Sequence, residues 1–210
     1  MPRFSNEQKV VLDEYMQKKL CEAATGILVE YGIENITMDK VAEAAGVAKG
    51  TIYNYFKDKN QLLSTISDTV LNPIFKRITK LANSNSEALF KLEEIAKIMF
   101  EAFSHHKRFF ILLHETRNSG MLGNKKPLEK RNEFISILRR IIEAAMKDGQ
   151  LRVSNPLVVA EIFAGMVMSI NISKIIIGTE RPIQEDLNIV MSIFTNGIQQ
   201  NATDCEDAKK

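Results

Sequence analysis

Residues 37–59 read TMDKVAEAAGVAKGTIYNYFKDK, and their pattern indicates two short helices on either side of a turn. Thr37 can cap a short helix, and Gly46 can end it. The apolar residues between them share one helical face: Met38, Val41, Ala42 and Ala45. A second short helix follows, in which Val47 and Ile52 face inward. Two short helices joined by a glycine turn predict a helix-turn-helix, whose second helix enters the DNA major groove.

Helical spacing of apolar residues continues through almost the whole chain, and sustained alternation of the strand type is nearly absent. The sequence therefore predicts an all-α protein of about nine helices. Capping boxes predict helix starts at Ser5-x-x-Gln8, Asp58-x-x-Gln61 and Ser84-x-x-Glu87. Pro127 and Asn155-Pro156 predict two more starts, and a last helix is expected over residues 182–200. Pro73 is expected to kink the helix that follows Asp58.

These signals divide the chain into two domains and a tail. Residues 1–58 are predicted to form a three-helix domain that contains the helix-turn-helix. Residues 59–200 form a second, longer helical domain, and residues 201–210 are polar and predicted to be disordered.

Charge and composition limit how such a chain can bind DNA. The net charge of the 210 residues is only +2, and residues 1–60 hold eight Lys or Arg against nine Asp or Glu. Any DNA binding must therefore depend on where the lysines lie. Cys21 and Cys205 form neither a disulfide framework nor a metal cluster. The absence of an apolar leader or of an uninterrupted apolar stretch near 18 residues predicts a cytoplasmic protein with no membrane partner.

Three local features of residues 37–59 point to a DNA partner. Gly50 lies inside a helix, where it costs about 1 kcal/mol relative to Ala, as expected if its backbone approaches a phosphate closely. Tyr53 and Tyr55 lie on a segment too short to bury both rings, so at least one hydroxyl is free for a phosphate. Lys57 and Lys59 flank a helix start, where the positive end of the macrodipole disfavours cations. A DNA phosphate would supply an anion that offsets this unfavourable interaction. The alternative is a packed hairpin with a solvated, charged face.

Residues 45–59 also resemble the signature of the TetR family of repressors, which is close to Ala-Gly-Val-x-Lys-Gly-Thr-x-Tyr-x-Tyr-Phe-x-x-Lys. The resemblance extends weakly to Ala23-Ala24 and Tyr31-Gly32 and covers roughly the first 60 residues. One departure is Ala48, where the family often has Ser. Another is the long stretch before Leu20, because residues 5–19 either lengthen the first helix or add a separate contact.

The resemblance, together with the local features above, assigns the DNA contacts residue by residue. Thr37 begins the second helix, the start of the third helix meets the groove, and the tyrosines and the last lysine contact phosphates or nearby bases. The predicted DNA-binding residues are Thr37, Lys49, Gly50, Thr51, Tyr53, Asn54, Tyr55 and Lys59. No cofactor, metal or catalytic residue is expected.

The resemblance further implies that residues 59–200 bind a small-molecule effector and form a homodimer. Small residues in the expected helix from Asn155 to Gly178, together with apolar residues of the last helix, predict a four-helix interface. Its members are Ala160, Ala164, Gly165, Ser169, Ser173, Ile189, Ile193 and Phe194. Methionine and phenylalanine side chains that can line an adaptable pocket are Met99, Phe100, Phe103, Phe109, Phe110, Met121, Met166 and Met168. Plain core packing is the alternative for both sets.

The expected mechanism is a homodimer that places two recognition helices on a palindromic operator and releases DNA when a small molecule binds. Activation instead of repression stays open. One rival is an enzyme that uses Glu101 and the cluster His105, His106, His114 and Glu115, although no zinc-binding or nucleophile motif is present. The other rival is a helical small-molecule-binding protein that does not bind DNA.

Overall fold

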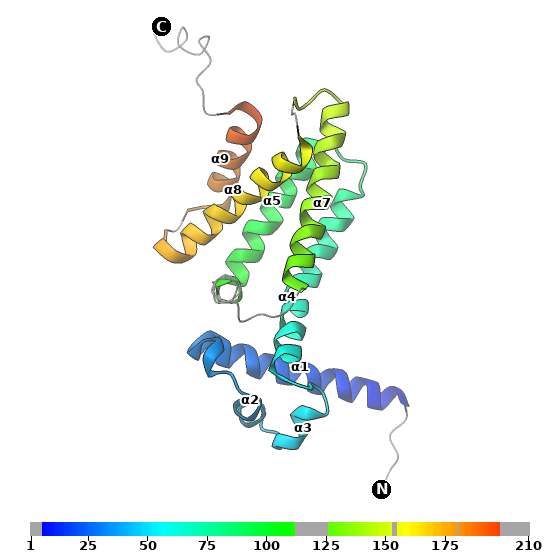
Figure 1. Ribbon diagram of the computed structural model, residues 1–210, viewed down its shortest axis with the longest axis vertical. Helices are drawn as coiled ribbons and strands as arrows, with labels where there is room; N and C mark the ends of the chain where they lie inside the picture. The colour runs from blue at the N-terminus through cyan, green and yellow to red at the C-terminus, as the bar shows by residue number, and fades with distance from the viewer. Residues whose placement is uncertain (1–5, 112–125, 153–154, 180, 198–210) are drawn as a thin grey trace. The chain divides into compact units, whose positions relative to one another are not determined.

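The computed structural model describes residues 6–111, 126–152, 155–179 and 181–197, and every element within these ranges is helical (Figure 1). The elements are α1 (Asn6–Tyr31), the 3-10 helix η1 (Ile33–Asn35), α2 (Met38–Ala44), α3 (Lys49–Tyr53), α4 (Lys59–Ala82), α5 (Ala88–His105), α7 (Lys126–Lys147), α8 (Pro156–Ile177) and α9 (Ile183–Asn196). Residues 107–111 are also helical. The all-α prediction is confirmed.

The described residues fall into two compact units. The first lies within Met1–Pro73 and His106–Glu129, and the second within Ile74–His105 and Lys130–Lys210. The division falls inside α4, whereas the sequence placed a domain boundary at residues 58 and 59. Helix α4 is assigned as one helix with Pro73 inside it.

Three of the predicted helix starts are confirmed by their hydrogen bonds. Thr37 caps α2, since its hydroxyl accepts from the backbone N–H of Lys40 at 3.2 Å. Asn155 caps α8 in the same manner. At the start of α4, the Asp58 carboxylate accepts from the Gln61 N–H at 2.8 Å, while the Gln61 side chain accepts from the N–H of Lys57. Ser5 and the tail at 201–210 lie outside the described residues.

The predicted capping box at Ser84 is wrong. The Ser84 hydroxyl donates to the carbonyl of Leu81 at 2.8 Å, so it belongs to the end of α4 and not to the start of α5. Helix α5 begins only at Ala88, and the first helical hydrogen bond runs from the Lys91 N–H to the Glu87 carbonyl. The Ser84 oxygen also accepts from the N–H of Ser86 at 3.4 Å, and Ser86 lies before α5, so this hydroxyl caps no N–H of the first turn of α5.

The core of the first unit joins α1, α2, α3 and the first turns of α4. Its buried members include Leu20, Ala24, Leu28, Ile36, Val41, Ala42, Ile52, Phe56 and Leu62. Cys21 is part of this core, and burial raises the pKa of its thiol to about 11. Burial of these side chains holds α2 and α3 against α1 (Figure 1). The apolar stripe predicted for residues 37–52 is therefore confirmed.

The core of the second unit is formed by buried residues of α5, α7, α8 and α9. Leu92, Leu138 and Phe163 are fully buried within it. Helix α5 packs against both α8 and α9, which also pack on each other (Figure 1). An edge-to-face pair of Phe163 and Phe194, with ring centroids 4.8 Å apart, joins α8 to α9.

Helix α8 is long and apolar on average, although polar residues interrupt its apolar sequence. Its segment Pro156–Lys174 has a mean hydropathy of 1.6 over 19 residues, which is long and apolar enough to cross a membrane, and 22% of it is buried. Length and composition alone do not distinguish a membrane span from a helix of a protein interface. The segment contains Glu161, whose carboxylate lies 3.7 Å from the guanidinium of Arg131 on α7.

Candidate DNA-binding interface

The turn between α2 and α3 is set by one glycine. Gly46 has φ +64°, a left-handed conformation that costs other residues more than it costs glycine. Its N–H donates to the Glu43 carbonyl, and the N–H of Val47 donates to the Ala42 carbonyl, both at 2.9 Å. This pair of hydrogen bonds is the Schellman arrangement, which ends α2 and directs the chain into α3.

Helix α3 and the residue that follows it present four of the eight predicted DNA-binding residues to solvent. Ile52 is its buried anchor, while Gly50, Tyr53 and Asn54 are exposed and Thr51 is half-buried. Tyr53 is 53% exposed as a residue, and its hydroxyl makes no hydrogen bond within the described residues. The expectation that one of the two tyrosines keeps a hydroxyl for an external acceptor fits Tyr53.

Nothing in the described part of the chain requires glycine at position 50. Gly50 has an ordinary helical conformation, and a Cβ at this position would meet no atom of the described residues within 4 Å. Alanine would therefore fit and would stabilise the helix by about 1 kcal/mol. The space next to Gly50 is open to an external partner, as a close DNA backbone requires.

Lys49, the first residue of α3, is held by an aspartate of α2. Its Nζ lies 2.6 Å from Asp39 Oδ2, and the side chains are 73% and 52% exposed. The hydrogen bond and charge of Asp39 raise the pKa of Lys49, so the lysine carries a full positive charge. The contact is a surface ion pair that water reaches from several sides.

Tyr55 is held by the first half of α1. Its hydroxyl donates to Asp13 Oδ1 at 3.1 Å, across 42 residues of sequence. The pKa of Tyr55 is raised, first by loss of solvent and then by this hydrogen bond. Helix α1 begins at Asn6, so the described part of the stretch at residues 5–19 lengthens the first helix, and it also carries a contact to the helix-turn-helix.

Lys59 is hydrogen-bonded to the 3-10 helix η1. Its Nζ donates to the Ile33 carbonyl at 2.7 Å, and loss of solvent lowers the pKa of its ammonium group. The lysine is half-buried, so part of the ammonium still faces solvent. Its remaining N–H donors can reach an anion.

Sequence reasoning missed three residues that contact this region. Asp13 and Asp39 bind predicted DNA-binding residues, and Arg108 donates to the Val29 carbonyl near the end of α1 at 2.7 Å. The only hint was the excess of acids over bases in residues 1–60, which did not say where the acids lie.

The predicted ligand residues are divided between the two units. Met99, Phe100, Phe103, Met166 and Met168 belong to the second unit, where Phe100 and Phe103 are buried. Phe109 and Phe110 belong to the first, with their rings edge-to-face at 5.3 Å, and Met121 lies outside the described residues.

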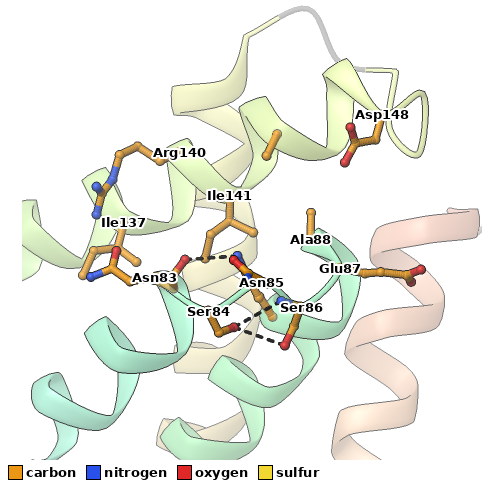
Figure 2. Close-up of a pocket in the computed structure, with 13 residues that line it drawn as sticks. Asn83, Ser84, Asn85, Ser86, Glu87, Ala88, Ile137, Arg140, Ile141 and Asp148 are labelled. Carbon is orange, nitrogen blue, oxygen red and sulfur yellow. Dashed lines mark hydrogen bonds between the residues drawn. The ribbon is translucent and has the colours of Figure 1, made fainter.

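A hollow of about 420 Å³ lies elsewhere in the second unit, between the α4–α5 connection, the start of α5 and the second half of α7 (Figure 2). Ile137 and Ile141 form an apolar wall, while Glu87, Arg140 and Asp148 bring charges to it. None of the predicted ligand residues lines this hollow.

The predicted dimer residues differ in accessibility. Ser169, Ile189 and Ile193 are exposed, and Ala164, Ser173 and Phe194 are half-buried. Ala160 is fully buried in its own chain, so it serves the core and has no surface to offer a second copy. Exposed apolar residues missed on the same helices include Leu157, Val158, Ile162 and Ile176.

The side chains Glu101 and His105 do not bind each other. The Glu101 carboxylate pairs with Arg77 at 3.0 Å, and the His105 ring bonds to the Glu101 backbone carbonyl at 2.7 Å. No group of three or more potential metal ligands occurs among the residues that the structure describes. His114 and Glu115 lie outside them.

Comparison with known proteins finds a matching family model for each of the two units. The family model of bacterial regulatory proteins of the tetR family matches residues 20–66, and that of the tetracyclin repressor-like C-terminal domain matches residues 86–172. A fatty acid metabolism regulator protein of Bacillus subtilis is 26% identical over 140 residues, which cover 66% of this chain and 71% of that protein. The repressor KstR2 of Rhodococcus jostii is 25% identical over 138 residues, covering 64% and 67%.

Solved structures share the fold over most of the chain. The fatty acid degradation regulator FadR of Bacillus halodurans has a TM-score of 0.74 at 19% identity and covers 89% of this chain and 97% of its own. FadR of Bacillus subtilis in complex with stearoyl-CoA has a TM-score of 0.72 at 22% identity, covering 88% and 100%.

Proposed function

Because the chain belongs to the TetR family of bacterial regulatory proteins, we propose that it is a transcriptional repressor that binds a palindromic operator as a homodimer. The observation that carries the proposal is Gly50, which is exposed on α3 beside Lys49 and Tyr53 and which no described residue requires to be glycine. Helix α3 is the recognition helix in this proposal. The DNA-contacting part ends at Lys59, and α4 continues from there into the second unit.

The homodimer is supported by the exposed apolar side chains of α8 and α9. Between 39% and 53% of the surface is exposed at Val158 and Ile162 of α8 and at Ile189 and Ile193 of α9. The small residues Gly165 and Ser169 lie on α8. Such a surface favours close packing of two helix pairs. We expect Ile162→Glu and Ile193→Glu to give monomers in sedimentation. Phe90→Glu, at an exposed apolar residue of α5, is the matched control and should stay dimeric.

The effector proposed is a long-chain acyl-CoA thioester. The support is the likeness to fatty acid regulators, one of them solved with stearoyl-CoA, and the set of Met and Phe side chains at 99, 100, 103 and 166. Binding of the thioester would favour an arrangement of the dimer with the wrong spacing of recognition helices. Such a repressor acts in the cytoplasm, where both DNA and acyl-CoA are found.

Selection of bound fragments from random duplex DNA tests the function. A palindrome with half-sites about 34–36 Å apart, centre to centre, is the expected product. Binding to it should weaken steeply with salt, because contacts to phosphates release counterions. Lys49→Ala and Tyr53→Ala should each weaken binding, whereas Lys147→Ala, at an exposed lysine of the second unit, should not. Binding of a long-chain acyl-CoA without DNA binding would instead favour the rival ligand carrier.

A further inference from the structure

Two groups predicted to meet DNA are already bound by carboxylates of the same unit. Lys49 Nζ lies 2.6 Å from Asp39 Oδ2, and the Tyr55 hydroxyl donates to Asp13 Oδ1 at 3.1 Å. We propose that Asp13 and Asp39 stand in for phosphate oxygens in the DNA-free protein and set its DNA affinity, because DNA must displace both. This inference rests on the proposed DNA-binding function.

The chemistry of the contacts makes the exchange necessary. A tyrosine has one hydroxyl proton, so Tyr55 cannot donate to Asp13 and to a phosphate together. The ammonium group of Lys49 has three donors, but a phosphate that approaches it also approaches the negative charge of Asp39. Each carboxylate therefore competes with DNA for a group that the family signature places at the interface.

Exposure makes the exchange possible. The Lys49 and Asp39 side chains are 73% and 52% exposed, and an ion pair in that setting is a weak contact. A phosphate oxygen replaces a carboxylate oxygen with the same charge and the same hydrogen-bond role. The pair can therefore open without disturbing the buried Ile52 and Val41 that hold the helices.

The position of Asp13 gives the first half of α1 a role. The family model begins at residue 20, and Asp13 lies on the turns of α1 that precede it. Its contact with Tyr55 joins these turns to the segment that follows the recognition helix. Two of the nine acidic residues in residues 1–60 thus bind groups that face DNA in this proposal, and there they limit the affinity for DNA.

The test compares Asp39→Ala and Asp13→Ala with the full-length parent chain. Binding is measured on a fluorescent duplex that carries the selected palindrome and on a duplex of scrambled sequence. Each substitution should tighten binding about three- to tenfold at low salt, and the gain should shrink as salt screens the charges. Thermal unfolding of each variant checks that the fold is kept.

Matched controls separate these contacts from a general effect of charge. Glu43→Ala on α2 and Glu14→Ala on α1 also remove an exposed carboxylate. Glu43 acts on Lys49 through its charge alone, and neither side chain makes a hydrogen bond to Lys49 or Tyr55 among the described residues. They should tighten binding by less than about twofold. In double-mutant cycles, the gain from Asp39→Ala should fall to the control level in Lys49→Ala, and that from Asp13→Ala in Tyr55→Phe.

The outcomes distinguish the inference from the function. Wild-type binding to the palindrome with gains no larger than those of the controls, or gains that persist in the Lys49→Ala and Tyr55→Phe backgrounds, overturns the inference alone. Failure of the wild-type chain and of all variants to bind either duplex overturns the DNA-binding function as well.

Discussion

Asp39 and Asp186 each bind a lysine, but water reaches one carboxylate and not the other. The Asp39 side chain is 52% exposed, whereas that of Asp186 has no exposed surface. Asp186, in the first turn of α9, contacts Lys174 at the end of α8 and accepts from Arg181 Nε at 2.8 Å. Lys174 also donates to the Arg181 carbonyl at 2.8 Å.

The difference shows that burial decides what a lysine–aspartate pair can do. An exposed pair can exchange one partner for another anion, whereas a buried pair fixes the contact between two helices. A buried carboxylate without its cations would be left uncompensated, so separating Asp186 from Lys174 and Arg181 is costly. An exposed pair loses little when it opens, because water replaces the partner. We infer that the DNA-facing unit keeps its charges exchangeable, while the helices proposed for the dimer keep theirs fixed.

The largest expected effect is therefore at Asp186. Asp186→Ala should lower the free energy of unfolding by about 3 kcal/mol, since Lys174 loses its partner in a mostly buried site. Asp39→Ala should change it by less than about 1 kcal/mol. Urea unfolding followed by circular dichroism measures both. Equal losses for the two variants would remove the distinction on which the comparison depends.

Gly50→Ala should separate stability from DNA binding within the exposed unit. Alanine improves helix propensity, so the free energy of unfolding should rise by up to about 1 kcal/mol, because a Cβ meets nothing at this site. The same methyl group would stand between α3 and a DNA backbone, so affinity for the selected palindrome should fall about tenfold. A variant that binds DNA as tightly as the parent would show that no backbone approaches Gly50.

Gly46→Ala is the matched substitution with the opposite expectation. A Cβ at Gly46 also meets nothing within 4 Å, but φ is +64° there. The strain should lower the free energy of unfolding by about 1 kcal/mol, and Gly46→Asn should lower it less, because Asn tolerates the left-handed conformation. Thermal unfolding compares the two. If alanine were harmless at both glycines, the turn would not depend on Gly46.

The helix-turn-helix could be predicted from the sequence because its determinants are local. Thr37 and Gly46 act on backbone groups within five residues of themselves, and the apolar face has a fixed spacing. The family signature then named the exposed residues of α3. Ser84 shows the limit of this reasoning, since two helix ends lie close enough to use its hydroxyl and spacing does not tell which one does.

The contacts that modulate the site could not be predicted, because they join distant residues. Asp13 and Tyr55 are 42 residues apart, and only the packing of α1 on the helix-turn-helix brings them together. In the second unit, Ala160 shows a related limit: a small residue on an apolar helix fits a core or an interface equally well until burial is known. The ligand residues have the same ambiguity, because Met and Phe line pockets and cores alike.

The smallest expected effect is at Ala48, the residue that departs from the family signature. Ala48 is the N-cap of α3, has an extended backbone and provides no side-chain cap. A serine hydroxyl can accept from a free N–H of the first turn while its own proton points to a phosphate. Ala48→Ser should therefore raise the free energy of unfolding by about 0.5–1 kcal/mol and tighten DNA binding about twofold.

Ala48→Val is the control for this last change, because it adds bulk without a hydroxyl and should improve neither property. Measured on the same duplex, a gain in stability without a gain in affinity would mean that the hydroxyl caps α3 but faces no phosphate. That result would contradict the placement of the α3 N-terminus on the DNA backbone. It would move the interface toward Tyr53 and Asn54, the exposed residues at the other end of the helix.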